Sequence, residues 1–331
     1  MPSAHFLTAD VFTDRAFGGN QLAVFPDAHA IPEELLLPIT REFNYSETTF
    51  VYPPRDEKHT RRVRIFTPGG EVPFAGHPTV GTAFVLFASG ELRCACDDAT
   101  IVLEEGVGPV PVKLRFPPAV EREDGDDARG HPTFAQLAVA KLPEASGPRP
   151  DAAALADVLS LDAGDFVGGD YGAEVVSCGL PFLIVPLRSR DAVRRARVRL
   201  EAWERTLRGT AGSEIMVFAL GDGAADSAGR ATVSLSVPRT PDVHARVFVP
   251  GLSVPEDPAT GSACAALGGY LAARTPRDDT TLRWTVEQGV EMGRPSRIEV
   301  EADKAGGRVT GVRVGGSAVL VSEGRLHFGE R

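Results

Sequence analysis

Two segments of this chain predict helices that have no polar face. One runs over about Pro78 to Ser89 (PTVGTAFVLFAS) and the other over about Pro258 to Arg274 (PATGSACAALGGYLAAR). A helix that is apolar all round is buried all round. The second helix also carries Gly268 and Gly269 in its middle, and each glycine costs about 1 kcal/mol relative to alanine, so another part of the chain must approach closely there. We therefore expect each helix to be enclosed by a curled sheet; the alternative is an ordinary core helix in a layered α/β protein.

The residues at the start of these two helices form an internal repeat. Gly76 to Ala83 reads GHPTVGTA and Glu256 to Ala263 reads EDPATGSA, so that proline, glycine, hydroxyl and alanine coincide without gaps. The repeat makes His77 and Asp257 equivalent, each directly before a proline suited to the first helical position. Helix N-termini carry unpaired N–H groups and a partial positive charge. Two such termini that open on one cleft between domains would bind an anionic ligand.

The length and the polar segments predict two domains. A chain of 331 residues favours two domains. The stretch VEREDGDDARGHP, which begins at Val120, offers almost nothing apolar to bury. We therefore expect a first domain over 1–120, a linker over 121–132 and a second domain over 133–331, and the last strand could return to the first domain.

Charge and hydropathy restrict the partners of the chain. The 45 acidic residues exceed the 35 basic ones, which gives a net charge of −10 and disfavours nucleic acid or an anionic membrane as partner. No apolar run reaches the roughly 18 residues that a membrane span needs, and the N-terminus lacks the basic start and apolar stretch of a signal peptide. We expect a cytoplasmic protein that acts on a small molecule.

Cysteine and glycine patterns disfavour metal and nucleotide sites. The four cysteines are too few and too scattered for a disulfide framework, so we expect reduced thiols. Cys94 and Cys96 lack a second pair at zinc spacing. The glycine clusters match neither dinucleotide-binding nor phosphate-binding loops. We therefore expect no metal and no cofactor.

Four side chains are candidates for chemistry. Glu47 lies where a helix-like run gives way to a strand-like one, beside aromatic and β-branched residues that can desolvate a carboxyl group and fit it for proton transfer. The alternative for Glu47 is a turn cap or a solvent-facing side chain. Asp257 has an alternative role as the N-cap of its helix. Histidine is a poor N-cap, so the presence of His77 at the matching position needs another explanation. Ser262 could be a nucleophile, although Gly261-Ser262-Ala263-Cys264-Ala265 does not match the G-x-S-x-G pattern.

Several blocks of the sequence resemble one family. The segments DVFTDRAFGGNQLAVF, NYSETTFV, RIFTPGGEVPFAGHPTVGTA, EDPATGSACAALGGYL and EQGVEMGRPSRIEV are similar to the signature blocks of the PhzF (phenazine biosynthesis) family, and they run from Asp10 to Val300. The family is related in fold to diaminopimelate epimerase. The resemblance implies an α+β fold of two pseudo-symmetric domains, each a β-barrel-like sheet wrapped around a central helix. It also implies an active site between the domains and a homodimer.

The resemblance also implies roles for individual residues. The phenazine pathway member is a cofactor-free isomerase of trans-2,3-dihydro-3-hydroxyanthranilate, and its acid/base glutamate falls on Glu47. Its histidine and aspartate fall on His77 and Asp257, and its serine falls on Ser262. The backbone amides that meet the substrate fall on Gly76 and Gly261. Thiol-based epimerisation is disfavoured, because no cysteine occupies the matching place in either repeat.

We therefore expect a cofactor-independent isomerase or epimerase that moves a proton on a small carboxylate substrate. Glu47, His77 and Asp257 would be catalytic. One alternative is a serine hydrolase that uses Ser262. The other is a protein of the same fold that binds a small ligand without catalysis. The segments over about 120–131 and 164–212 look longer than in compact family members, which leaves the substrate open.

Overall fold

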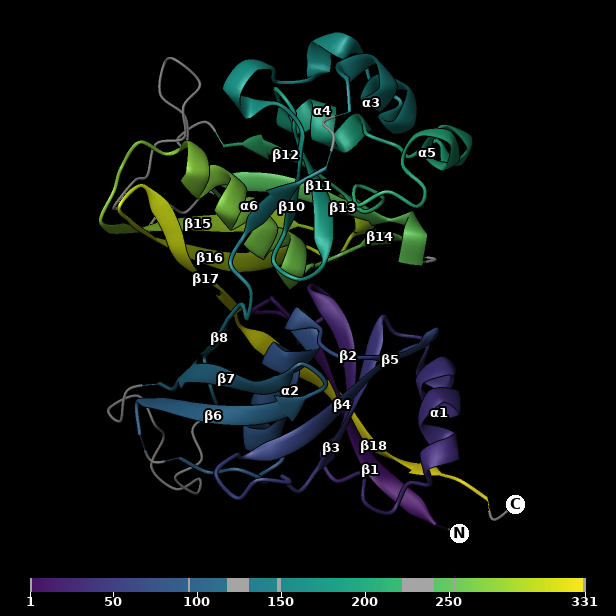
Figure 1. The fold of residues 1–331 in the computed structure, drawn as a ribbon. Helices are drawn as coiled ribbons and strands as arrows, with labels where there is room; N and C mark the ends of the chain where they lie inside the picture. Colours follow the sequence, from purple (N-terminus) through teal and green to yellow (C-terminus); the bar gives the residue numbers. More distant parts are fainter. Residues whose placement is uncertain are drawn as a thin grey trace. The chain divides into compact units, whose positions relative to one another are not determined.

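The computed structural model describes residues 2–94, 96–117, 131–147, 150–221, 241–252 and 254–329. The chain divides into two compact units, the first made of Met1–Ala138 with Gly315–Arg331 and the second of Val139–Val314 (Figure 1). The first unit extends beyond the boundary expected at 132, because β8 (Phe134–Ala138) pairs with β7 (Gly108–Arg115). The C-terminal strand β18 (Ala318–His327) pairs with β1 (Ser3–Val11) and belongs to the first unit. The expected linker over 121–132 lies outside the described residues except for its last two positions.

The strands of the first unit are hydrogen-bonded to one another in one continuous series. Besides β1, β7, β8 and β18, they are β2 (Asn20–Phe25), β3 (Glu47–Tyr52), β4 (Arg61–Thr67), β5 (Gly70–Val72) and β6 (Asp98–Glu105). The order is β18-β1-β2-β3-β4-β6-β7-β8, and β5 pairs with β4 as well. The β2–β3 and β4–β6 pairs are parallel and the others antiparallel. Since parallel neighbours start at the same sheet edge, the first residues of β2 and β3 lie together.

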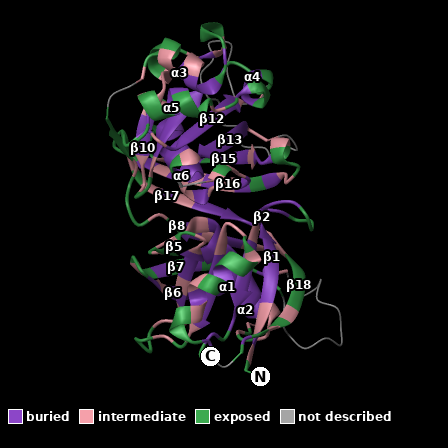
Figure 2. Cartoon of the chain, turned by 90° about the vertical axis from the view of Figure 1, so that its right-hand side faces the viewer, coloured by how far each residue is buried: buried purple, intermediate pink, exposed green. Residues whose placement is uncertain are grey.

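Helix α2 (Gly76–Ala88) is enclosed by this sheet. It contacts strands from both ends of the order, namely β18 and β1 at one end and β7 and β8 at the other, so the sheet curls around it. Every residue from His77 to Phe87 is buried, which the reader can follow in Figure 2. A Cβ on Gly81 would lie 2.6 Å from side-chain atoms of both Leu22 and Val11, so the glycine lets the helix approach the strands closely.

Helix α1 (Leu36–Phe43) lies outside the sheet and covers an aromatic cluster. Within this cluster the rings of Phe25 and Phe50 stack with their centroids 5.1 Å apart. α1 ends at Asn44, whose left-handed backbone (φ 52°) reverses the chain toward β3. The exposed outer side of α1 contrasts with buried α2 in Figure 2.

The second unit has its own strand order. Its strands are β9 (Glu144–Ser146), β10 (Glu174–Ser177), β11 (Pro181–Pro186), β12 (Ile215–Leu220), β13 (Val243–Val249), β14 (Val254–Asp257), β15 (Thr280–Gln288) and β16 (Ser296–Ala305), with most of β17 (Arg308–Gly316). The order from β9 is β9-β10-β11-β12-β13-β15-β16, and β14 pairs with β13 as well. The β11–β12 and β13–β15 pairs are parallel.

Helix α6 (Gly261–Arg274) is the buried helix of the second unit and contacts β10, β11, β15 and β16. The expectation of a close approach at its two central glycines is confirmed. A Cβ on Gly268 would lie 2.7 Å from Cγ1 of Val300, and one on Gly269 would overlap the ring of Pro143. The helix therefore lies nearer to its sheet than an alanine helix could.

Short helices complete the described structure. The second unit contains α3 (Ala152–Leu159), α4 (Arg190–Arg195) and α5 (Leu200–Thr206), which share one apolar cluster with β10, β11 and β12. The 3-10 turns are Glu33–Leu35, Ala163–Asp165, Gly169–Tyr171, Pro250–Leu252 and Val290–Met292. Within the segment over 164–212, α4 and α5 contribute to this cluster, whereas the segment over 120–131 falls outside the described residues except for position 131.

The expectation that each proline occupies the first helical position is wrong. Helix α2 begins at Gly76, two residues before Pro78, because the Ala75 carbonyl already accepts the Thr79 N–H at 3.2 Å. Helix α6 begins at Gly261, after Pro258, because β14 continues to Asp257 in its pairing with β13. Pro78 still lies where the helix needs no donor, since the first N–H groups of a helix have no intrahelical partner, and Pro258 lies outside α6.

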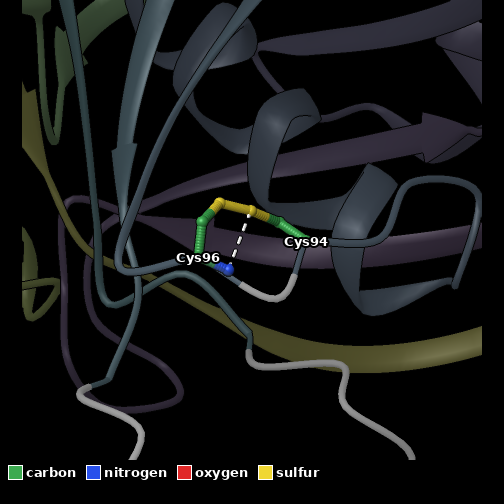
Figure 3. Close-up of a disulfide and its surroundings, with 2 residues drawn as sticks. All are labelled: Cys94 and Cys96. Atoms are coloured by element: carbon green, nitrogen blue, oxygen red, sulfur yellow. Dashed lines mark hydrogen bonds between the residues drawn. A yellow bond between two sulfur atoms is a disulfide. The ribbon is translucent and has the colours of Figure 1, made fainter.

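Three further observations concern expectations from composition. The expectation of reduced thiols is wrong for Cys94 and Cys96, which form a disulfide (Figure 3), while Cys178 and Cys264 are free. No helix in the described ranges is both long and apolar enough to cross a bilayer. No group of three or more potential metal-binding side chains was found among the residues that the structure describes.

Candidate functional site

Glu47 lies at the edge of the first unit's sheet where parallel strands begin. It is the first residue of β3 and pairs with Leu22 of β2. Asn20 is the first residue of β2, so its side chain and that of Glu47 start from the same sheet edge. The left-handed turn at Asn44 brings the chain from α1 to this point. Glu47 is half-buried, with 16% of its side chain exposed, so the alternative of a solvent-facing carboxylate is wrong.

His77 meets Glu47 at the start of α2. Its Nε2 lies 3.2 Å from Oε2 of Glu47. Its Nδ1 lies 3.3 Å from Nδ2 of Asn20, whose Oδ1 accepts the Ser46 hydroxyl at 3.3 Å. His77 precedes Gly81 by four residues and therefore shares its helix face. The close approach at Gly81 thus sets the imidazole against the start of β2.

Burial governs the protonation of His77. The residue is only 5% exposed. Desolvation lowers the pKa of His77 to about 3, and a hydrogen bond to the Gln21 backbone opposes this only in part. The imidazole is therefore neutral across the physiological range. The pair is a carboxyl group facing a neutral ring rather than a carboxylate facing an imidazolium.

Asp257 belongs to a separate network in the second unit. Its Oδ2 accepts the Thr260 hydroxyl at 2.5 Å. The Thr260 oxygen in turn accepts an N–H from Nε2 of Gln288 at 3.0 Å, and the same amide nitrogen donates to the Asp257 carbonyl at 2.7 Å. An amide nitrogen only donates, so the Thr260 hydroxyl must direct its proton to Asp257. The network fixes Oδ2 of Asp257 as an acceptor.

The interpretation of Asp257 as a helix N-cap is wrong. The N-cap of α6 is Thr260, and it makes no side-chain capping bond. The backbone N–H of Thr260 donates to Oε1 of the fully buried Gln288 at 3.2 Å. Asp257 is the last residue of β14, and a bulge in the pairing with β13 precedes it.

The remaining candidates lie in the first turns of the two helices. Gly76 is the first residue of α2, and Gly261 and Ser262 are the first two residues of α6. Ser262 is half-buried. Within the described second unit no side chain is hydrogen-bonded to Ser262. The unit's buried histidine, His244, is engaged by Glu287 and Glu291 at 2.9 Å each.

Sequence reasoning missed the side chains that orient these candidates. Asn20 orients the ring of His77, and Thr260 and Gln288 hold Asp257. Asn20 follows Gly18-Gly19 in the turn before β2, and Gln288 precedes Gly289 at the end of β15. A polar residue beside a turn glycine was the available signal, but such residues are common in turns.

Comparisons with known proteins agree with this architecture. The family model described as phenazine biosynthesis-like protein matches residues 9–324. An uncharacterized isomerase from Mesorhizobium japonicum is 38% identical over 330 residues, with 98% of this chain and 99% of the relative covered. A trans-2,3-dihydro-3-hydroxyanthranilate isomerase from Pseudomonas aeruginosa is 33% identical over 323 residues, with 98% and 99% covered.

The fold is shared with a solved structure as well. The crystal structure of a PhzF-family phenazine biosynthesis protein from Bacillus anthracis aligns with a TM-score of 0.82 at 24% identity, covering 99% of this chain and 100% of that one. The resemblance expected from the signature blocks is therefore confirmed, and so is the enzyme class of the chain, isomerase. The chain belongs to the phenazine biosynthesis-like (PhzC-PhzF) family.

Proposed function

We propose that this protein is a cofactor-independent isomerase in which Glu47 takes a proton from a carbon atom of a small carboxylate substrate and returns it elsewhere. The observation that carries the proposal is the 3.2 Å approach of Oε2 of Glu47 to Nε2 of a buried, neutral His77. A cationic imidazole would hold the carboxylate in an ion pair. A neutral imidazole leaves Glu47 able to accept and return a proton, which is the requirement for a general acid/base group.

The second unit contains a matching set of candidate residues. Its strand and helix order supports an origin by duplication: β11–β12 and β13–β15 are parallel as β2–β3 and β4–β6 are, and a buried helix follows β14 as α2 follows β5. We infer two pseudo-symmetric units. In this scheme the first-turn amides near Gly76 and Gly261 bind the substrate carboxylate, and Asp257 and Ser262 orient the substrate.

The substrate class and the assembly are part of the proposal. The Pseudomonas aeruginosa relative carries the name of a trans-2,3-dihydro-3-hydroxyanthranilate isomerase, so a cyclic carboxylate of that kind is the first candidate to test. The family resemblance favours a homodimer, which sedimentation of the purified protein would report. Nucleic acid and membrane are not partners in this proposal.

The test is proton exchange in D2O with trans-2,3-dihydro-3-hydroxyanthranilate as the probe. The wild type should place deuterium on the product. Glu47→Gln should reduce the rate by at least about 100-fold, because an amide cannot act as the base that the carboxylate provides. Glu42→Gln, which changes an exposed glutamate of α1, is the matched control and should keep the wild-type rate. Full activity of Glu47→Gln would refute the assignment.

The hydrolase alternative has its own test. Fluorophosphonate reagents label activated serine nucleophiles, and we expect no label on Ser262, because no described residue of its own unit is hydrogen-bonded to it as a general base. A stoichiometric label that is lost in Ser262→Ala would favour the hydrolase.

A further inference from the structure

Glu105 is a buried carboxyl group that the proposed reaction does not use. It is the last residue of β6 and is 8% exposed. Its Oε1 lies 2.7 Å from Oγ1 of Thr79, in the first turn of α2. Its Oε2 is buried and has no hydrogen-bond partner within the described residues. The side chain therefore makes one hydrogen bond, and it makes it two residues away from His77.

The Thr79 hydroxyl lies within hydrogen-bond distance of two oxygen atoms that could each accept its proton. Its oxygen also lies 2.8 Å from the carbonyl oxygen of Ala75. A hydroxyl has one proton, and a carbonyl oxygen can only accept it. If Thr79 donates to Ala75, the short contact with Glu105 needs a second proton, which only a protonated carboxyl group can supply. Ionised Glu105 would instead leave two acceptors competing for one proton and a charged oxygen without a partner.

The surroundings of Glu105 agree with a neutral side chain. Burial is the main influence on its pKa, and the Thr79 hydroxyl opposes it; no described lysine, arginine or histidine contributes. Burial raises the pKa of Glu105 to about 8. Beside it, Gly106 packs against Pro73, whose carbonyl accepts the Val107 N–H at 3.1 Å. The carboxyl group is thus enclosed by uncharged groups.

The second unit contains an uncharged counterpart. Gln288 ends β15 as Glu105 ends β6, and each is followed by glycine. β15 runs parallel to β13 as β6 runs parallel to β4. Gln288 is fully buried, and its amide nitrogen donates to the Thr260 hydroxyl beside α6. Glutamine has the shape of a protonated glutamate and donates from the same position.

We propose that Glu105 is a positioning residue that works as a neutral carboxylic acid: it donates to Thr79, holds the first turn of α2 and so keeps His77 against Glu47. Gln288 does the corresponding work in the second unit. The role of Glu105 in catalysis rests on the proposed function, but the geometry that it maintains does not. Loss of its proton at alkaline pH would release the first turn and disturb His77.

The test follows the ring of His77 directly, so that it does not depend on a known substrate. Histidine-labelled protein is titrated from pH 6 to pH 9.5 by NMR, with the His77 signal assigned from a His77→Gln spectrum. The wild-type signal should move with a midpoint near pH 8. Glu105→Gln should hold His77 at its low-pH position throughout, and Glu105→Leu should displace it at every pH.

Activity provides the second readout. If the probe substrate is turned over, the wild-type rate should fall about tenfold for each pH unit above the midpoint, as for one essential protonated group. Glu105→Gln should retain the neutral-pH rate and lack this alkaline fall. An alkaline fall or a His77 shift that persists in Glu105→Gln would overturn the proposal, as would a Gln variant that does not fold. Absence of turnover in every variant, with the NMR result intact, would instead overturn the proposed function.

Discussion

Replacement of Glu105 by glutamine should make the first unit more stable, and the gain should grow with pH. The pKa of Glu105 is about 8 in the folded chain against an ordinary value of 4.5. Between these values the unfolded chain has lost the proton while the folded chain keeps it. The free energy of unfolding therefore falls as pH rises through this window, and the loss is complete above the folded pKa.

The magnitude follows from the interval between the two pKa values. The interval of about 3.5 pH units at about 1.4 kcal/mol per unit gives a loss of about 5 kcal/mol above pH 8 and of about 3 kcal/mol at pH 7. Glutamine cannot ionise and keeps the donor to Thr79. The difference in free energy of unfolding between Glu105→Gln and wild type should then rise by about 1.4 kcal/mol per pH unit from about pH 5 and level off above pH 8.

The assay must report the first unit. Trp203 and Trp284, the only tryptophans of the sequence, both belong to the second unit, so tryptophan fluorescence would follow the wrong part of the chain. Hydrogen exchange of peptides that cover α2 over pH 5.5–9 measures opening of the correct unit, once corrected for intrinsic exchange. Other ionisable groups contribute equally to both proteins and cancel in the difference. A difference that stays flat with pH, or that favours wild type at alkaline pH, would refute the neutral state of Glu105.

Three further changes test the packing and the polar networks. Gly81→Ala should lower the melting temperature, because overpacking typically costs about 1–3 kcal/mol and exceeds the gain of about 1 kcal/mol in helix propensity; an unchanged or higher temperature would contradict the close approach. Thr260→Val should destabilise the second unit in urea by about 1–3 kcal/mol, because one of the two N–H groups of the Gln288 amide loses its Thr260 acceptor, whereas Thr260→Ser should stay close to wild type. Reduction of the Cys94–Cys96 disulfide should cost no more than roughly 1.5 kcal/mol, because it closes only a three-residue loop; a larger loss on adding dithiothreitol would show a role beyond the loop.

The enclosed helices could be predicted because a fully buried helix has apolar residues on all its faces. A helix without a polar face must be surrounded, and α2 is buried from His77 to Phe87. The glycines at 268 and 269 likewise mark close contacts, here with Val300 and Pro143. Such signals need no knowledge of strand pairing.

The helix starts and the orienting side chains could not be predicted, because they depend on strand register. Pro258 precedes α6 only because β14 stays paired up to Asp257. Asn20 reaches His77 only because β2 and β3 begin at the same sheet edge. Gln288 reaches Thr260 across 28 residues. The local sequence around each residue carries no information on these distant partners.

The two units handle buried charge in different ways, and the difference points to the start of α2. In the second unit, Arg246 is buried and forms two hydrogen bonds with Glu256, at 2.8 and 2.7 Å. Burial lowers the pKa of His244, but its two glutamate partners outweigh this and raise it. These charges are paired and serve the fold.

At the start of α2, the buried titratable side chains are neutral instead of being paired with an opposite charge. His77 has its pKa lowered to about 3 and Glu105 has its pKa raised to about 8, so both are uncharged at neutral pH. Neither can supply a counter-charge to Glu47 at the head of β3. Neutral neighbours suit a carboxyl group that has to change its protonation during turnover.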